Sequence, residues 1–110
     1  MGPNQTETSA PSTLQARMRY ARELAEVEPA EMDRLAGFGW RGHYALIEAG
    51  VHRRPTGESL AKIGRALGVS IDWLVSGTGR GPNRETVLRA VQNARAAAIK
   101  AKKAPPPEAA

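Results

Sequence analysis

The sequence from Met32 to Leu74 reads MDRLAGFGWRGHYALIEAGVHRRPTGESLAKIGRALGVSIDWL, and this stretch decides the fold. Its apolar residues recur at steps of three and four, which is the spacing of one face of an α-helix. Glycines divide it into short segments, because a glycine after a helix readily takes the left-handed conformation that ends it. The stretch therefore predicts short helices at about 40–49, at about 57–67 and at 71–76, with Thr56 and Ser70 as N-caps.

Two further helices are predicted before this stretch, at residues 14–27 and from Pro29 to about residue 36. Ser12 or Thr13 caps the first, and Pro29 occupies the first turn of the second, where its missing N–H costs no hydrogen bond. Residues 1–13 are rich in Pro, Ser, Thr, Asn and Gln, so we expect a flexible arm there. The basic side chains of the first helix are expected to form a solvated face: Arg17, Arg19 and Arg22.

A last helix, at residues 83–103, is predicted after a glycine-rich linker at 78–82, and a Pro/Ala-rich tail at 104–110 is expected to be disordered. The apolar residues of this helix alternate in steps of four and three, as in a coiled-coil seam. Three arrangements are possible: the helix pairs with its twin in a homodimer, packs back on its own domain, or extends as a loose basic segment. The candidate dimerisation residues are Val87, Leu88, Val91, Ala94 and Ala98.

Length and composition exclude several classes of protein. The 110 residues fit one compact domain with tails, which leaves little room for a long catalytic cleft. There is no cysteine, so neither disulfides nor a thiolate metal site are expected. No apolar run approaches the roughly 18 residues that span a bilayer, and the N-terminus lacks the apolar core of a secretory signal. We therefore expect an intracellular protein that does not bind membranes.

Signals for catalysis are absent from the sequence. The glycine-rich segment at 77–81 lacks the lysine and the spacing of a phosphate-binding loop. No Ser/His/Asp set can be argued at this length, and the two histidines, His43 and His52, have no further metal ligand at a plausible spacing. The sequence thus predicts no enzyme, no cofactor, no metal site and no small-molecule substrate.

The net charge of +5 is unevenly distributed. Residues 14–79 hold nine Lys or Arg and eight Asp or Glu, whereas residues 80–110 hold seven Lys or Arg and two Glu. A basic protein is often a nucleic-acid binder. Here the predicted domain is nearly neutral, and the excess of positive charge lies in the residues that follow it. Charge alone therefore favours DNA binding only weakly.

The most specific motif combines Ile47-Glu48-Ala49-Gly50, Pro55, Leu60, Ala66-Leu67-Gly68-Val69-Ser70, Asp72 and Leu74. On these residues the chain resembles the phage-repressor and Cro-like helix-turn-helix family, also called the xenobiotic-response-element family. The resemblance implies an all-α fold, a five-helix lambda-repressor-like domain at residues 14–77, followed by the C-terminal helix. It also implies a cytoplasmic, bacterial or phage-encoded protein that binds double-stranded DNA.

In this family the third helix enters the major groove and reads base edges. The resemblance assigns base contacts to the start of this helix and to a position one turn later, at Arg41, Gly42, His43 and Leu46. It assigns phosphate contacts to the helix start and to the following basic loop, at Trp40, His52, Arg53 and Arg54. Arg41 is the preferred base reader because a guanidinium can donate two hydrogen bonds to one guanine. Glu48 matches a position that braces the recognition helix.

The chain departs from the family pattern around the turn. Glu28 and Pro29 stand where the family often has a phosphate-bonding glutamine, and Ala49 replaces a usual asparagine. One extra residue lies between Phe38 and Tyr44. An acid at the start of the second helix repels phosphate, and proline has no N–H to donate.

Two functional hypotheses follow from these observations. The first is a sequence-specific transcriptional regulator, acting as a dimeric repressor. The second is a protein-binding adaptor on the same scaffold, of the antitoxin or anti-repressor kind, because a fold does not fix a function. The position of the acids distinguishes them: DNA binding is favoured if Arg41, Arg53 and Arg54 share a face with few acids, and the adaptor if Glu28 and Glu31 lie among them.

Overall fold

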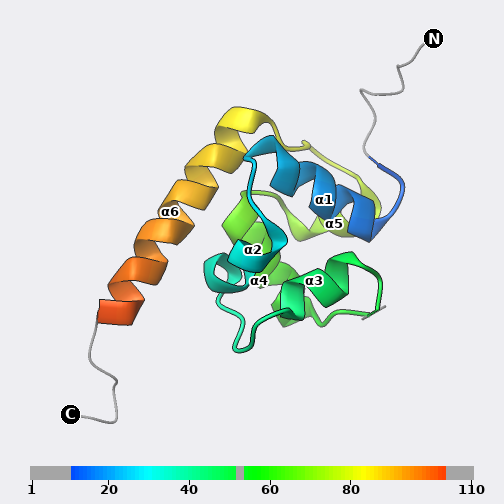
Figure 1. Cartoon of the computed structure of the whole chain (residues 1–110). Helices are drawn as coiled ribbons and strands as arrows, with labels where there is room; N and C mark the ends of the chain where they lie inside the picture. Colours follow the sequence, from blue (N-terminus) through cyan, green and yellow to red (C-terminus); the bar gives the residue numbers. More distant parts are fainter. Residues whose placement is uncertain (1–10, 52–53, 104–110) are drawn as a thin grey trace.

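A computed structural model describes residues 11–51 and 54–103 of the chain, and these form six α-helices and no strand (Figure 1). The expected arm, most of which is residues 1–10, and the expected tail at 104–110 lie outside the described residues. The all-α fold that the sequence predicts is confirmed. The helices are α1 (Leu14–Leu24), α2 (Pro29–Ala36), α3 (His43–Glu48), α4 (Gly57–Leu67), α5 (Ile71–Ser76) and α6 (Arg84–Lys103).

Side-chain caps fix where four of the helices begin. The hydroxyls of Thr13, Thr56 and Ser70 each accept a hydrogen bond of 3.0 Å from a backbone N–H in the first turn of α1, α4 and α5. The Asn83 carboxamide oxygen accepts one of 2.9 Å from the N–H of Thr86 at the start of α6. These are the caps that the sequence predicts, because they depend on residues only three positions apart.

The helices from α1 to α5 surround the core. Figure 1 shows these five helices as one body with α6 along its side. Its largest fully buried side chains come from these five helices, from the turn after α1 and from the start of α6: Met18, Val27, Met32, Tyr44, Ile47, Ile63, Leu67, Leu74, Val87 and Val91. Trp73 is buried as well, whereas Ile71 and Val75 on the same short helix stay exposed. The apolar stripes of the helices therefore meet in one cluster.

The first helix ends earlier than the sequence predicts. We expected it to reach residue 27, but α1 stops at Leu24, and Glu26 takes a left-handed conformation with φ of 57°. A hydrogen-bonded turn closes the helix here, since the N–H groups of Ala25 and Val27 both donate to the Arg22 carbonyl and the Arg22 guanidinium donates to the Val27 carbonyl. The chain turns here, and Val27 enters the core.

Two arginines of α1 are buried, contrary to the expected solvated face. Arg17 reaches across to the end of α5, where its guanidinium donates hydrogen bonds of 2.7 Å to the carbonyls of Leu74 and Val75. The last carbonyls of a helix have no partner within the helix, so Arg17 satisfies two of them. Arg22 is buried beside α3, while Arg19 stays exposed.

The first half of α6 packs on its own domain. Val87 and Val91 are fully buried in the core, and Leu88 and Ala94 pack against it. A Cβ added at Gly68, at the end of α4, would lie 2.9 Å from the Cβ of Ala90, so this glycine permits the close approach of α6. The prediction that Val87 and Val91 form a dimer seam is therefore wrong, because the chain's own core covers both residues.

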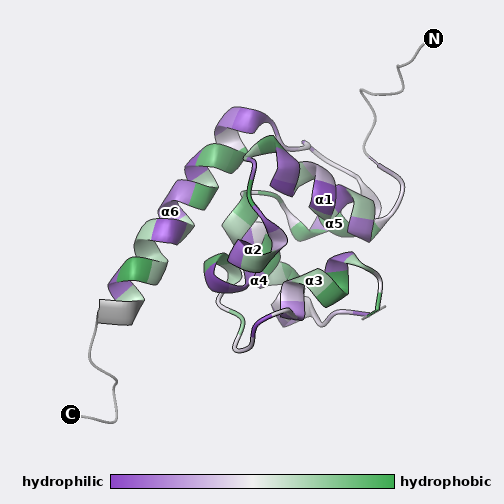
Figure 2. Cartoon of the chain, in the orientation of Figure 1, coloured by the Kyte–Doolittle hydropathy of each residue, from purple (hydrophilic) through white to green (hydrophobic). Residues whose placement is uncertain are grey.

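Polar and charged residues recur along the whole length of α6 (Figure 2). None of the described helices is long and apolar enough to cross a membrane.

Replacing Val91 by alanine tests whether α6 belongs to the cooperative core. We expect Val91→Ala to lower the free energy of unfolding by about 1–3 kcal/mol, because it leaves a cavity among buried side chains. The matched control is Ile99→Ala on the same helix, where the side chain is 57% exposed, and it should change the value by less than about 0.5 kcal/mol. Urea denaturation followed by circular dichroism measures both. A loss for Val91→Ala that depends on protein concentration would contradict packing within one chain.

Candidate nucleic-acid interface

Helix α3 is short, and one of its faces is anchored in the protein. Tyr44 and Ile47 are fully buried, and Glu48 is buried at its end. The opposite face is open to solvent at Ala45 and Ala49 and half-buried at His43 and Leu46. A surface helix whose outer face carries small side chains can approach another surface closely.

Helix α3 begins later than the sequence predicts. We expected it to start at residue 40 or 41, but α3 starts at His43. Gly42 is its N-cap and has φ of +94°, a conformation that L side chains rarely adopt. Trp40 and Arg41 therefore lie in the turn before α3, and both are exposed.

Asp33 of α2 holds the start of α3 in place. Its carboxylate accepts hydrogen bonds of 2.7 Å from the N–H of Gly42 and 2.8 Å from the N–H of Tyr44. Gly42 has no side chain to cap its own helix, so a carboxylate from the preceding helix takes this role. The side chain of Asp33 thus fixes the geometry of the turn that contains the extra residue.

Aromatic rings stack along this turn. The indole of Trp40 lies parallel to the His43 ring, with centroids 4.7 Å apart and an interplanar angle of 4°. The ring of Phe38 also lies beside His43, with its centroid 4.3 Å away. Phe38 is half-buried against the core, and the Lys62 ammonium lies 6.0 Å from its centroid. The stack gives the segment between α2 and α3 a defined shape at the surface.

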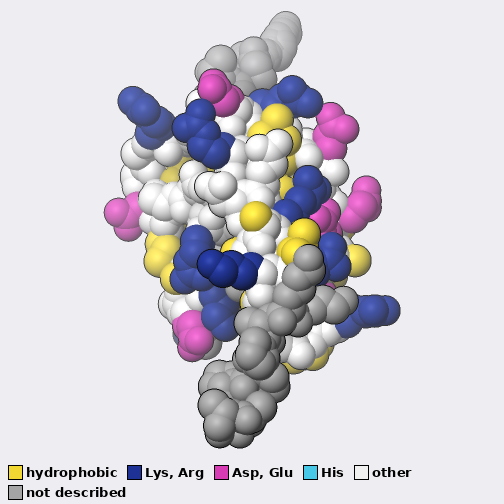
Figure 3. All heavy atoms as spheres, turned by 90° about the vertical axis from the view of Figure 1, so that its left-hand side faces the viewer, with side chains coloured by type: hydrophobic (Ala, Val, Ile, Leu, Met, Phe, Trp, Pro, Cys, Tyr) yellow, Lys and Arg dark blue, Asp and Glu magenta, His cyan; other side chains and the backbone are white. Residues whose placement is uncertain are grey.

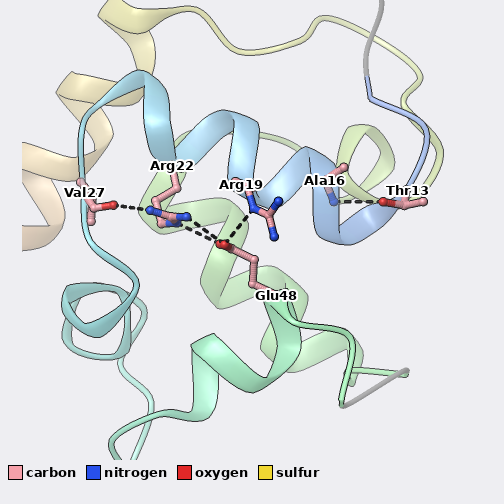
Figure 4. A network of polar contacts seen from close by, with 6 residues as sticks. All are labelled: Thr13, Ala16, Arg19, Arg22, Val27 and Glu48. Carbon is pink, nitrogen blue, oxygen red and sulfur yellow. Dashed lines mark hydrogen bonds and ion pairs between the residues drawn. The ribbon is translucent and has the colours of Figure 1, made fainter.

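The other end of α3 is joined to α1 by a buried ion pair (Figure 4). Arg22 donates two hydrogen bonds to the Glu48 carboxylate, at 2.9 Å and 2.8 Å, and a third of 2.7 Å to the Val27 carbonyl. Arg19 adds a longer contact of 3.4 Å to Glu48 from the solvent side. This geometry matches the bracing role that the family resemblance implies for Glu48.

The ionisation of Glu48 follows from these contacts. Burial by itself would raise its pKa, but the hydrogen bonds and the positive charge of Arg22 outweigh burial and lower the pKa below the ordinary value of 4.5. Burial, and then the negative charge of Glu48, raise the pKa of the neighbouring Tyr44. Tyr44 therefore stays neutral in the core while Glu48 stays charged.

A cleft of about 780 Å³ separates the start of α2 from the turn before α3. Arg41 and Trp40 line one side of it, and Glu28, Glu31 and Asp33 line the other. Two of these acids already have partners. Asp33 caps α3, and Glu31 accepts hydrogen bonds of 2.7 Å and 3.1 Å from Arg95 of α6, which lower its pKa.

The predicted contact residues fall into three groups. Trp40, Arg41, Gly42 and His43 lie together at the start of α3, and Leu46 lies one turn later. Arg54 is exposed after α3, whereas His52 and Arg53 lie outside the described residues. Among the residues that the structure describes, no group of three or more His, Asp or Glu side chains could hold a metal ion.

Arg22 and Asp33 position α3, and neither role was predicted from the sequence. Arg22 carries a signal that could have found it, since it lies four residues after Met18 and thus falls on the apolar stripe of α1. A charged residue in such a stripe indicates a buried partner. Asp33 has no comparable signal, because a single acid on a short helix is most often exposed to solvent.

Removing the charge of Glu48 should destabilise the protein in a pH-dependent way. Glu48→Gln leaves Arg22 buried without a counterion, and we expect a loss of about 3–5 kcal/mol in the free energy of unfolding at pH 7. Because the folded pKa of Glu48 lies below 4.5, its contribution is complete above that pH and is lost as the pH falls through the folded value.

Denaturation of the native chain and of Glu48→Gln over a pH series measures the difference in their free energies of unfolding. This difference should shrink below pH 4.5. The matched control is Glu58→Gln, since Glu58 forms an exposed ion pair with Lys62 and should change stability by less than about 1 kcal/mol. An equal effect of the two substitutions would show that the Arg22–Glu48 pair does not hold α3.

Replacing Asp33 by alanine should loosen the start of α3. Two backbone N–H groups lose their acceptor, so we expect a loss of about 1–3 kcal/mol in stability and faster amide exchange at Tyr44. Amide hydrogen exchange followed by NMR measures the protection of the Tyr44 amide. The control is Asp72→Ala in the exposed first turn of α5. Unchanged protection of the Tyr44 amide would contradict the capping role.

Comparison with known families agrees with this architecture. A family model described as Helix-turn-helix matches residues 18–74, from within α1 to α5 and over more than half of the chain. No curated protein and no solved structure gave a match. The matched span contains the caps, the turn and α3, and it confirms the resemblance drawn from the motif at residues 47–74. The chain therefore belongs to the helix-turn-helix family of the Cro/C1 type, a DNA-binding family whose members are typically not enzymes.

Proposed function

We propose that this protein is a sequence-specific transcriptional regulator that reads double-stranded DNA with the start of α3. The observation that carries the proposal is the double anchoring of this short helix. Asp33 holds its first turn and the Arg22–Glu48 pair holds its last, while Arg41, His43 and Leu46 remain at or near the surface. Base readout requires side chains on a rigid element, because hydrogen bonds to base edges tolerate little displacement.

Each residue around α3 has a distinct proposed role. Arg41, in the turn, donates two hydrogen bonds to a guanine, and Leu46 contacts a thymine methyl group one turn later. The exposed alanines at 45 and 49 allow the helix to lie deep in the groove. Trp40 and Arg54 contact phosphates on either side of α3, and His52 and Arg53 belong to the same proposed phosphate-binding loop.

A dimeric repressor is the form of regulator that we propose. A two-fold dimer would place two copies of α3 on half-sites about one turn of DNA apart. Pairing through Val87 and Val91 is not part of the proposal, since both are buried in the core. Ile71 and Val75 lie one turn apart on α5 and are 41% and 49% exposed, which favours α5 as the pairing helix.

The adaptor hypothesis also has an observation in its favour. Glu28 and Glu31 line the same cleft as Arg41, where they would face a DNA backbone placed against α2. Arg95 and Arg34 neutralise Glu31, however, and Asp33 is occupied by backbone N–H groups. Glu28 is then the one acid of this cleft for which the described residues show neither an ion pair nor a side-chain hydrogen bond. We therefore favour DNA, and not a protein bound through these acids, as the partner of the surface around α3.

Selection of random duplex DNA followed by sequencing tests the role of Arg41. We expect the native chain to enrich a palindromic site and Arg41→Ala to lose preference at one base pair per half-site. At that site Arg41→Ala should cost about 1–3 kcal/mol of binding free energy.

Two matched variants distinguish the reading of bases from electrostatic attraction to phosphates. Arg54→Ala should weaken binding to all sequences alike and lower the slope of log K against log salt by about 0.9, since it removes one phosphate contact. Arg89→Ala, on α6 and away from α3, should leave the motif unchanged. If Arg41→Ala weakened every sequence equally, it would not be a base reader, and if no motif emerged from the native chain, the adaptor hypothesis would replace this proposal.

A further inference from the structure

A second hollow, of about 500 Å³, lies between the C-terminal half of α6 and the main body. Its walls come from the end of α2, from α4 and from α6 between residues 90 and 101. We call it the α6 groove. Figure 3 shows the molecule from the α6 side, where Lys and Arg side chains flank hydrophobic patches. None of the predicted DNA contacts lines this groove.

The groove exists because α6 buries large side chains against the body only in its first half. Val87 and Val91 are buried, and Ala90 meets Gly68 at the end of α4. Beyond this point α6 presents small side chains to the body, with Ala94, Ala97 and Ala101 lining the groove. Arg95 fixes this half of the helix through its hydrogen bonds to Glu31, so the groove is held open by a defined contact.

The chemistry of the groove is an apolar floor between basic edges. Leu35, Ala36 and Ala66 form the floor on the body side and are buried. Arg34 and Arg65 stand on the rim, and both are exposed. No acidic residue lines the groove among the described residues, which show no ion pair for Arg65 and one of 3.8 Å between Arg34 and Glu31.

We infer that the α6 groove is a docking site for an amphipathic, acidic segment of a partner protein. A hollow of about 500 Å³ with an apolar lining accommodates large apolar side chains from one face of a helix, and the arginines on the rim pair with its flanking carboxylates. The inference goes beyond DNA recognition and does not depend on it, because the groove is built from α2, α4 and α6 and leaves the start of α3 uncovered.

Charge decides between this occupant and the alternatives. A second copy inserting its own α6 would bring Arg95 and Lys100 towards Arg34 and Arg65, which is repulsive. DNA would satisfy the arginines but has no side chain to cover the apolar floor. An acidic amphipathic segment covers the apolar floor with its hydrophobic face, and its carboxylates pair with the arginines of the rim.

Selection from a display library of random peptides, about four helical turns long, tests the inference on the full chain. We expect enriched peptides with Leu or other large apolar residues at helical spacing and Asp or Glu beside them. Binding of the selected peptides is then measured by fluorescence anisotropy with the native chain and with three variants whose folding is checked by circular dichroism.

Ala97→Glu places a carboxylate in the groove, and Arg65→Glu reverses one charge of the rim. We expect each to weaken the selected peptides at least about tenfold, and Arg65→Glu to shift a new selection towards basic peptides. The control is Arg89→Glu, at an exposed position of α6 that does not line the groove, and it should leave binding within about twofold.

Several outcomes would overturn the inference. These are the enrichment of basic or uncharged peptides, binding that Ala97→Glu leaves unchanged, and the absence of any enriched peptide. Self-association of the native chain that Ala97→Glu abolishes in sedimentation experiments would assign the groove to a second copy. Displacement of the peptides by duplex DNA that Arg41→Ala does not relieve would assign it to nucleic acid. A failure of DNA selection at α3 would leave this result unaffected.

Discussion

The ion pair between Arg22 and Glu48 is the contact on which the placement of α3 depends. Both side chains are buried, so the cost of removing their charges from water must be met by close geometry. Arg22 meets it with two hydrogen bonds to one carboxylate and a third to the Val27 carbonyl. The same arginine thereby joins α1, the turn into α2 and the end of α3. A purely apolar contact could stabilise this junction as well, but it would set the orientation of α3 less sharply.

The start of α3 is held in place by a different contact. The turn before it contains one more residue than the family pattern, and it carries glycines at 39 and 42. A flexible turn would leave the helix poorly placed, because glycine has many accessible backbone conformations. Asp33 removes that freedom with two hydrogen bonds to the backbone across the turn, and the Trp40–His43 stack covers it from outside. An atypical turn therefore still presents its side chains in a fixed arrangement.

The last helix has two halves with different physical roles. Its first half carries Val87 and Val91 and is part of the core, and Gly68 allows it to lie close to α4. Its second half carries alanines and basic residues, and it leaves an apolar groove against α2 and α4. The hydrogen bonds between Arg95 and Glu31 also link α6 to the cleft beside the turn before α3, where they neutralise one acid. One helix thus completes the core, borders a second surface and adjusts the charge near the first.

The sequence by itself determined the helices, their caps and the family, because these depend on apolar spacing and on hydrogen bonds between residues three or four apart. The caps at Thr13, Thr56, Ser70 and Asn83 are all of this kind. Only the tertiary structure decided which charged residues pair with each other, where α3 begins and which face of α6 is free. Arg22 and Glu48 are 26 positions apart, and Arg95 and Glu31 are 64 apart. Contacts over such separations depend on how whole helices pack, and no local pattern in the chain records that packing.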